Sequence, residues 1–180
     1  MRRLLLLLLI ASAPSVHAQI AESDAELVTQ AVLALPESMR AGATVVRFAE
    51  GTQEILKPGG NGMFCQADDP DVAGIAIWCY PQSHDAYARR WYELAADGKS
   101  RSEVDEQIAA EIEADELEWP GAAVNYNLRG GSLDTAVPLT VVYVPFATGD
   151  ELGVTEDRQF NRPWLMYPGT AFAHIMIPGQ

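Results

Sequence analysis

The 180-residue sequence lacks an apolar run long enough to span a bilayer, has few basic residues, and contains only two cysteines. Its one leucine-rich stretch, residues 4–11, is far shorter than the about 20 apolar residues of a transmembrane helix. Only 12 Lys and Arg side chains stand against 25 Asp and Glu. So acidic a chain lacks the basic surface through which proteins bind phosphate backbones and anionic membranes. These deficits argue against nucleic acid as a partner and against membrane insertion.

The N-terminus has the three parts of a secretory signal peptide. Arg2 and Arg3 precede the leucine-rich stretch, and Ala18 ends a small-residue cleavage site. We therefore predict a signal peptide at residues 1–18 and a single mature domain at residues 19–180. Cleavage removes two arginines and no acid, so 10 basic and 25 acidic side chains remain and the formal net charge is −15. The mature protein is expected to be periplasmic or extracellular, with its charge keeping it in solution.

The two cysteines, Cys65 and Cys79, lie in a glycine-rich stretch around which we expect the domain to pack. Two short apolar segments, 63–67 and 74–80, flank an acidic turn and predict a hairpin. Because cysteines pair in an oxidising compartment, we predict a Cys65–Cys79 disulfide. The spacing is not C-x-x-C and no histidine lies between the cysteines, which argues against a catalytic or metal-binding pair.

Hydrophobic periodicity predicts an α+β fold, with a mostly antiparallel sheet of about six strands and about three helices. Helical patterns begin after three expected N-cap residues and cover 23–35 (Ser23), 83–96 (Ser83) and 102–117 (Ser102). Besides the hairpin, segments typical of strands are 43–48, 53–56, 123–128, 139–144, 164–167 and 171–177. A long loop is expected at 146–162.

Three polar features each have a structural and a functional interpretation. Residues 58–62 predict a glycine-rich turn or bulge, whereas a phosphate cradle would need a following helix. Asp68, Asp69 and Asp71 predict a solvated turn in which aspartates cap local amides, and the alternative is a calcium site. The acidic helix at 102–117 is expected to face solvent, and the alternative is docking of a basic partner.

His84 stands beside a serine and an aspartate, in an order that resembles a catalytic triad. Adjacent side chains at the start of a helix point in different directions, so they cannot form the chain of hydrogen bonds that a triad needs. We therefore expect His84 to lie on the surface. The 25 acidic residues leave open a carboxylate pair for glycoside hydrolysis, but such a number of acids is no evidence for one.

His174 lies in the last predicted strand, where alternation places Phe172, His174 and Met176 on one face. The simplest interpretation is a half-buried histidine beside an aromatic ring. The alternative is a copper site, because imidazole and thioether ligands suit copper outside the cytoplasm. A third ligand would then have to come from another segment, with Met166, Met63 or His84 as the candidates.

The chain resembles a group of small secreted bacterial proteins that have no assigned activity. The shared residues are Leu35-Pro36, Ala43-Thr44-Val45, Leu56, Gly59, Asn61-Gly62, Cys65, Asp69-Pro70, Cys79 and His174-Ile175-Met176. The chain departs from the group at Met63 and Phe64, where the group has Trp and Thr, and at Ala173, where it has Pro. The resemblance implies a secreted, disulfide-linked fold and no particular activity.

Two functions from different classes follow. We predict a non-enzymatic module that binds a small ligand or a protein partner, with no cofactor. The alternative is an extracytoplasmic enzyme or copper protein built around His174 and Met176. The surroundings of His174 discriminate between them, because a nearby carboxylate or a hydrogen bond to His84 would favour the enzyme.

Overall fold

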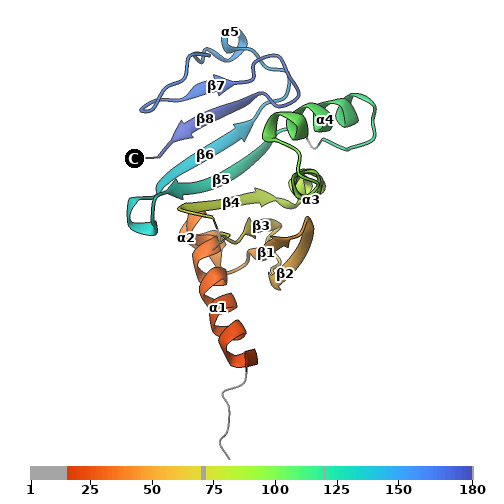
Figure 1. Ribbon diagram of the computed structural model, residues 1–180. Coiled ribbons are helices and arrows are strands. Elements are labelled where there is room, and N and C mark those ends of the chain that lie inside the picture. Colours follow the sequence, from red (N-terminus) through yellow and green to blue (C-terminus); the bar gives the residue numbers. More distant parts are fainter. Residues whose placement is uncertain (1–15, 70–71, 120, 180) are drawn as a thin grey trace, which may run out of the picture.

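The computed structural model describes residues 16–69, 72–119 and 121–179 (Figure 1). Its α-helices are α1 (Val16–Ala31), α2 (Glu37–Arg40), α3 (Asp85–Ala96), α4 (Arg101–Glu113) and α5 (Gly149–Leu152). Its strands are β1 (Thr44–Ala49), β2 (Thr52–Lys57), β3 (Met63–Gln66), β4 (Ile75–Pro81), β5 (Ala123–Gly130), β6 (Val137–Tyr143), β7 (Trp164–Met166) and β8 (His174–Pro178). Short 3₁₀ turns are η1 (Val32–Ala34), η2 (Gln82–His84) and η3 (Leu133–Thr135).

Most of the predicted signal peptide, residues 1–15, lies outside the described residues, as does Asp71 of the acidic turn. Residues 16–18, the end of the predicted signal peptide, are the first residues of α1. Within the described part of the chain, no helix is both long and apolar enough to cross a bilayer.

The eight strands form one mixed sheet in the order β2-β1-β3-β4-β5-β6-β8-β7. The α+β class is confirmed, but the predictions of about six strands and about three helices were too low, since the described residues form eight strands and five α-helices. Each predicted strand segment contains a strand, and β2 and β7 lie at the two edges of the sheet. Neighbouring strands are antiparallel except β1 and β3, which are parallel because β2 turns back onto the outer side of β1.

One face of the sheet is covered by α1 and η1. Alternation along β4 turns Ile77 and Cys79 toward this face, where they pack against Ala31 and Leu35. The cluster continues over β1 and β3 through Val45 and other fully buried side chains. In Figure 1, the N-terminal part of α1 extends beyond the sheet, so it is the C-terminal end of this helix that closes the core.

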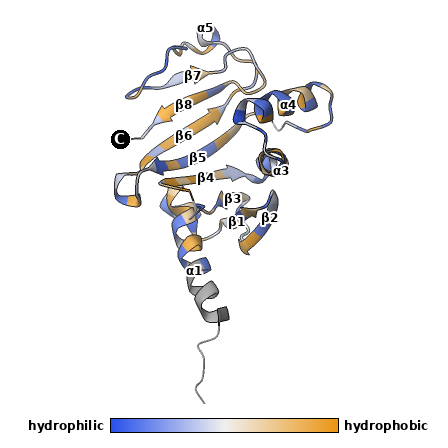
Figure 2. Cartoon of the chain, in the orientation of Figure 1, coloured by the Kyte–Doolittle hydropathy of each residue, from blue (hydrophilic) through white to orange (hydrophobic). Residues whose placement is uncertain are grey.

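The opposite face is covered by α3 and α4, which lie side by side (Figure 1). Figure 2 shows both helices largely hydrophilic, with the more hydrophobic colours on β6 and β8. The few apolar residues of the two helices are nevertheless buried, since Leu94, Val104 and Ile108 form one cluster. Ile112 is partly buried and packs against the same cluster.

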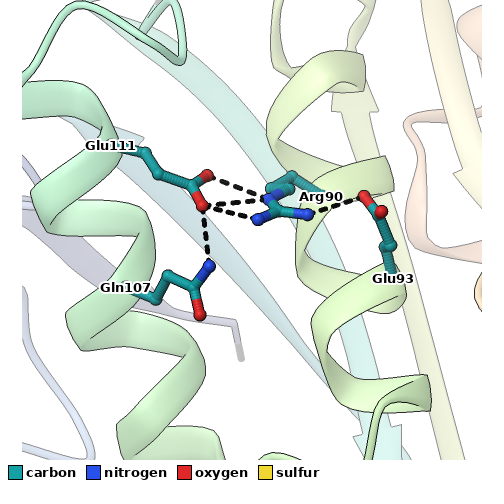
Figure 3. A network of polar contacts seen from close by, with 4 residues as sticks. All are labelled: Arg90, Glu93, Gln107 and Glu111. Carbon is teal, nitrogen blue, oxygen red and sulfur yellow. Dashed lines mark hydrogen bonds and ion pairs between the residues drawn. The ribbon is translucent and has the colours of Figure 1, made fainter.

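An ion-pair network joins α3 to α4 (Figure 3). Arg90 donates from Nε and Nη2 to the Glu111 carboxylate at 2.9 and 2.6 Å, and its Nη1 lies 2.9 Å from Glu93. Gln107 donates to the same carboxylate at 2.9 Å. The guanidinium lowers the pKa of Glu111. Because Glu111 thus pairs within the molecule, part of the acidic helix does not present free charge to a partner.

All three predicted N-caps were wrong. Helix α1 begins before Ser23, and η2 precedes α3, so that His84 rather than Ser83 occupies the N-cap position. The cap of α4 is Ser100, not Ser102, and Glu103 completes a capping box with it. The sequence offers serines at both 100 and 102, but only the first is followed three residues later by a Glu, the capping-box signature.

The Cys65–Cys79 disulfide is confirmed, and the two residues lie directly opposite each other in the β3–β4 antiparallel pair. The adjoining acidic turn behaves in part as predicted, since Asp68 accepts a hydrogen bond of 2.8 Å from the amide of Ala76. The 58–62 segment is irregular, as predicted. Gly59 packs so tightly against the backbone of residues 42–44 that no side chain fits there.

Candidate functional site

Both histidines of the predicted mature chain lie in one aromatic cluster between the sheet and the helices α3 and α4. We call it the histidine cluster, and its members are His84, Tyr87, Trp119, Tyr143, Phe172 and His174. The ring of Tyr143 on β6 lies between the histidines, with its centroid 4.9 Å from His84 and 5.0 Å from His174. Segments that are far apart in the sequence therefore build a single site.

The prediction that His84 lies on the surface was wrong, because its side chain is 0% exposed. The 3₁₀ turn η2 directs it inward, while its neighbour Asp85 accepts a hydrogen bond of 2.6 Å from Gln53. With the Asn125 amide oriented so that its oxygen accepts from Trp78 Nε1, His84 Nδ1 lies 3.3 Å from that amide. Burial lowers the pKa of His84 to about 4, so its imidazole is neutral at pH 7.

Two polar atoms of the histidine cluster are buried without a hydrogen-bond partner. They are His84 Nε2 and Trp119 Nε1. Among the side chains that the structure describes, no other buried nitrogen or oxygen atom lacks a partner. The two rings stack, with centroids 4.9 Å apart and planes inclined by 23°. An unsatisfied buried donor or acceptor costs about 1–3 kcal/mol of folding free energy. The two unpaired nitrogens therefore make this end of the cluster less stable than a fully apolar core would be.

His174 occupies the other end of the cluster and is 8% exposed. Its Nδ1 lies 2.7 Å from the carbonyl oxygen of Phe172. Because a carbonyl can only accept, Nδ1 carries the proton and Nε2 keeps its lone pair. Burial lowers the pKa of His174, which favours the neutral ring. The aromatic neighbours were predicted, but His174 is more deeply buried than the half-buried histidine that was expected.

Two methionines flank His174 on its own face of the sheet. Met166 is its direct partner in the β7–β8 pair, and Met176 lies two residues along β8. The predicted shared face of His174 and Met176 follows from the observed strand, although Phe172 precedes β8 and reaches the cluster from a turn. Met63 packs on the opposite face of the sheet, in the α1 core. Of the three candidate third ligands, Met166 is the one adjacent to His174.

Next to His174 the cluster reaches the surface through Tyr167. This ring lies 5.7 Å from the His174 ring and is 43% exposed. Tyr167 follows Met166, so regular alternation would send it to the other face of the sheet. Its backbone is instead left-handed, with φ of +55°, and its ring contacts His174.

A second exposed aromatic residue with left-handed backbone lies beside this segment. Phe146 has φ of +64° and is 66% exposed. Its amide donates to the carbonyl of Thr170 at 2.8 Å, and the amide of Thr170 donates to that of Tyr167 at 3.3 Å. The loops after β6 and β7 therefore hold two strained aromatic residues at one end of the sheet.

Two shallow depressions run along α3, away from the ring faces of the histidines. The larger, of about 450 Å³, lies between the β1–β2 turn and α3, and Glu50, Glu93 and Asp97 line it. The smaller, of about 290 Å³, lies beside Ser83, Asp85 and Glu118. Arg89 borders both. Neither His84 nor His174 lines either depression, so a ligand bound in one of them would not contact these histidines.

In the described part of the chain, no group of three or more His, Cys, Asp and Glu side chains is placed to hold a metal ion. The calcium alternative for the acidic turn includes Asp71, which lies outside these residues, so it stays a prediction. Comparisons with protein-family models, with curated proteins and with solved structures find no match.

Sequence reasoning missed Trp119, Tyr143 and Asn125, which join His84 to the cluster. Trp119 follows an acidic helix and Tyr143 ends a strand. No sequence motif around either residue indicates a functional site. A usable signal was present at Tyr143, since alternation along β6 puts it on the same face as Val141 and Leu139. Without the strand order, that face could not be matched to His174.

Proposed function

We propose that the mature protein is an exported, non-catalytic binding protein whose ligand contacts the β7–β8 end of the sheet. The surface in question consists of His174, Tyr167 and Phe146. The disulfide is compatible with export, because such bonds persist in oxidising compartments.

The observation that carries this proposal is the pair of strained aromatic residues, Tyr167 and Phe146. A left-handed backbone costs about 1–2 kcal/mol for a residue with a side chain, and bulky residues are uncommon there. Such strain persists where the surrounding structure enforces it, and it clusters at ligand clamps and active sites. Here it aims one ring at His174 and leaves both rings exposed, which is the arrangement of a contact surface.

The neighbours of the histidines favour binding over catalysis. His174 Nδ1 is occupied by the carbonyl of Phe172, and the Tyr143 ring separates His174 from His84. In a Ser-His-Asp triad, a buried carboxylate orients the histidine, which lies within hydrogen-bond reach of the nucleophile. The contacts of His174 are a backbone carbonyl and aromatic rings instead.

Glycine substitution tests the proposal, because glycine relieves the strain and deletes the ring. Tyr167→Gly and Phe146→Gly should leave the free energy of unfolding unchanged or raise it by up to about 1 kcal/mol. Native mass spectrometry of protein purified from its own compartment should show a bound species on the wild type that the double variant lacks.

Glu50→Gly is the matched control, since Glu50 also has a left-handed backbone, φ of +50°, but lies in the distant β1–β2 turn. It should relieve strain to a similar degree and keep the bound species. A wild-type protein that carries nothing, or a double variant that retains the ligand, would contradict the proposed function.

A further inference from the structure

We infer that His174, Met166 and Met176 form a binding site for a soft monovalent metal ion, Cu(I) or its analogue Ag(I), with the Trp164 ring beside it. The inference rests on the proposed function, since it names the class of ligand that the β7–β8 end of the sheet takes. It needs no redox step, because the ion is bound in its reduced state.

The sheet register brings the three ligands together. Met166 pairs directly with His174, and Met176 pairs with Trp164, in adjacent positions of the same two strands. Side chains of directly paired residues lie on one side of a sheet with Cβ atoms about 4.5–5.5 Å apart. Residues two apart in a strand also share a face. His174, Met166, Met176 and Trp164 therefore form a two-by-two block on the face that carries the histidine cluster.

Four methionines remain after residue 18, and two of them border the same histidine. Met166 and Met176 are both partly accessible, as a ligand to an incoming ion must be. The remaining two, Met39 and Met63, belong to the α1 core on the other face. Met39 and Met63 therefore serve as internal controls for changes that a metal ion causes at Met166 and Met176.

The hydrogen bond of His174 suits a metal ligand. Metal-binding histidines commonly donate one ring N–H to a carbonyl, which fixes the ring and leaves the other nitrogen free to coordinate. The Nδ1 bond to Phe172 O at 2.7 Å is of this kind, and it leaves the Nε2 lone pair for the ion. Rings of Tyr143 and Tyr167 hold the imidazole from two sides.

The ligand set selects the metal. Thioether sulfur is a soft donor that favours Cu(I), whereas zinc, calcium and magnesium take thiolate, imidazole or oxygen donors. The set of one imidazole and two thioethers is neutral, which suits a monovalent ion, and an indole face attracts a cation further. The Arg101 guanidinium is exposed and lies 3.7 Å from the Asp105 carboxylate, which offsets its charge.

Methionine-methyl NMR during a titration with Ag(I) tests the site on the full mature protein. The methyl signals of Met166 and Met176 should shift and saturate at one equivalent, while those of Met39 and Met63 stay in place. Zn(II) should shift none of them. Four unmoved methyl signals, or equal shifts of all four, would overturn the inference.

Variants give a second, independent measurement through anaerobic competition with a colorimetric Cu(I) chelator. Met166→Leu, Met176→Leu and His174→Phe should each weaken binding by about 100-fold or more, because even the loss of an outer-shell partner of a metal ligand costs about 10–100-fold. Met39→Leu is the matched control, a partly buried methionine elsewhere, and should bind as the wild type does. Equal affinity of all variants would overturn the site.

The same experiments separate this inference from the proposed function. An organic ligand that co-purifies and is lost from the Tyr167→Gly, Phe146→Gly variant, together with absent Ag(I) binding, overturns the metal site alone. Ag(I) binding that those glycine substitutions leave unchanged supports the metal site and contradicts the role of the strained rings.

Discussion

Acidification should destabilise the protein through His84, the fully buried histidine of the cluster. Its pKa falls from 6.5 to about 4 in the folded state because burial disfavours the charged ring. The unfolded chain therefore binds the proton more readily, so stability is complete above pH 6.5 and is lost as the pH falls toward 4. One pKa unit corresponds to about 1.4 kcal/mol, which gives a loss of about 3 kcal/mol between pH 7 and pH 4.

A His84→Phe variant isolates this contribution, because phenylalanine keeps an aromatic ring against Trp119 and cannot titrate. Urea unfolding, followed by far-ultraviolet circular dichroism at several pH values from 7 to 4, gives the free energy of unfolding of both proteins. The wild-type curve should fall about 3 kcal/mol further than the variant curve. His174 and the carboxylates titrate in both proteins, so their contributions cancel in the difference.

The test compares how steeply the free energy of unfolding falls with pH in the two proteins. Their stabilities at pH 7 are not compared, because the substitution also removes the contact with Asn125. A loss of about 3 kcal/mol is a large share of the 5–15 kcal/mol that stabilises a typical domain. Wild-type and variant curves that stay parallel within about 0.5 kcal/mol, the usual error of additivity, would refute the burial of a neutral His84.

Two further predictions concern the stability of the β1–β3–β4 region. Gly59→Ala should destabilise the protein by more than about 3 kcal/mol, because the added Cβ would lie 2.3 Å from the backbone of Ala43. Gly60→Ala, with no atom within 4 Å of the added Cβ, should change thermal stability by less than about 0.5 kcal/mol, and equal effects would contradict the packing. Replacing both cysteines with alanine should cost about 3 kcal/mol in urea unfolding, as expected for a loop of about 15 residues, and an unchanged midpoint would argue against the bond.

The strands were predictable because each has a local cause. Short apolar segments bounded by turn residues mark most of them, and the disulfide followed from two cysteines flanking one turn. The parallel β1–β3 pair and the strand order were not predictable, because they depend on which edge of the sheet each hairpin joins. The predicted helix starts were wrong for a different reason, because several serines could act as N-caps. At α4 the N-cap is Ser100, since Glu103 completes a capping box with it.

The site was predictable only in part. The shared face of His174 and Met176 follows from alternation within one strand, and the structure agrees. The position of Met166 opposite His174 depends on the β7–β8 register across a turn, which the sequence does not encode locally. His84 was placed wrongly because the helix was expected to start at Ser83, whereas the η2 turn rotates the histidine into the aromatic cluster.

The location of the disulfide limits the order in which the protein can assemble. Both cysteines are 0% exposed, and Cys79 Sγ lies 3.3 Å from the carbonyl oxygen of Ala31 at the end of α1. Once α1 has docked, an oxidoreductase has no route to the sulfur atoms. Oxidation must therefore precede the docking of α1, and a chain that closes while still reduced would remain a dithiol until it opens again.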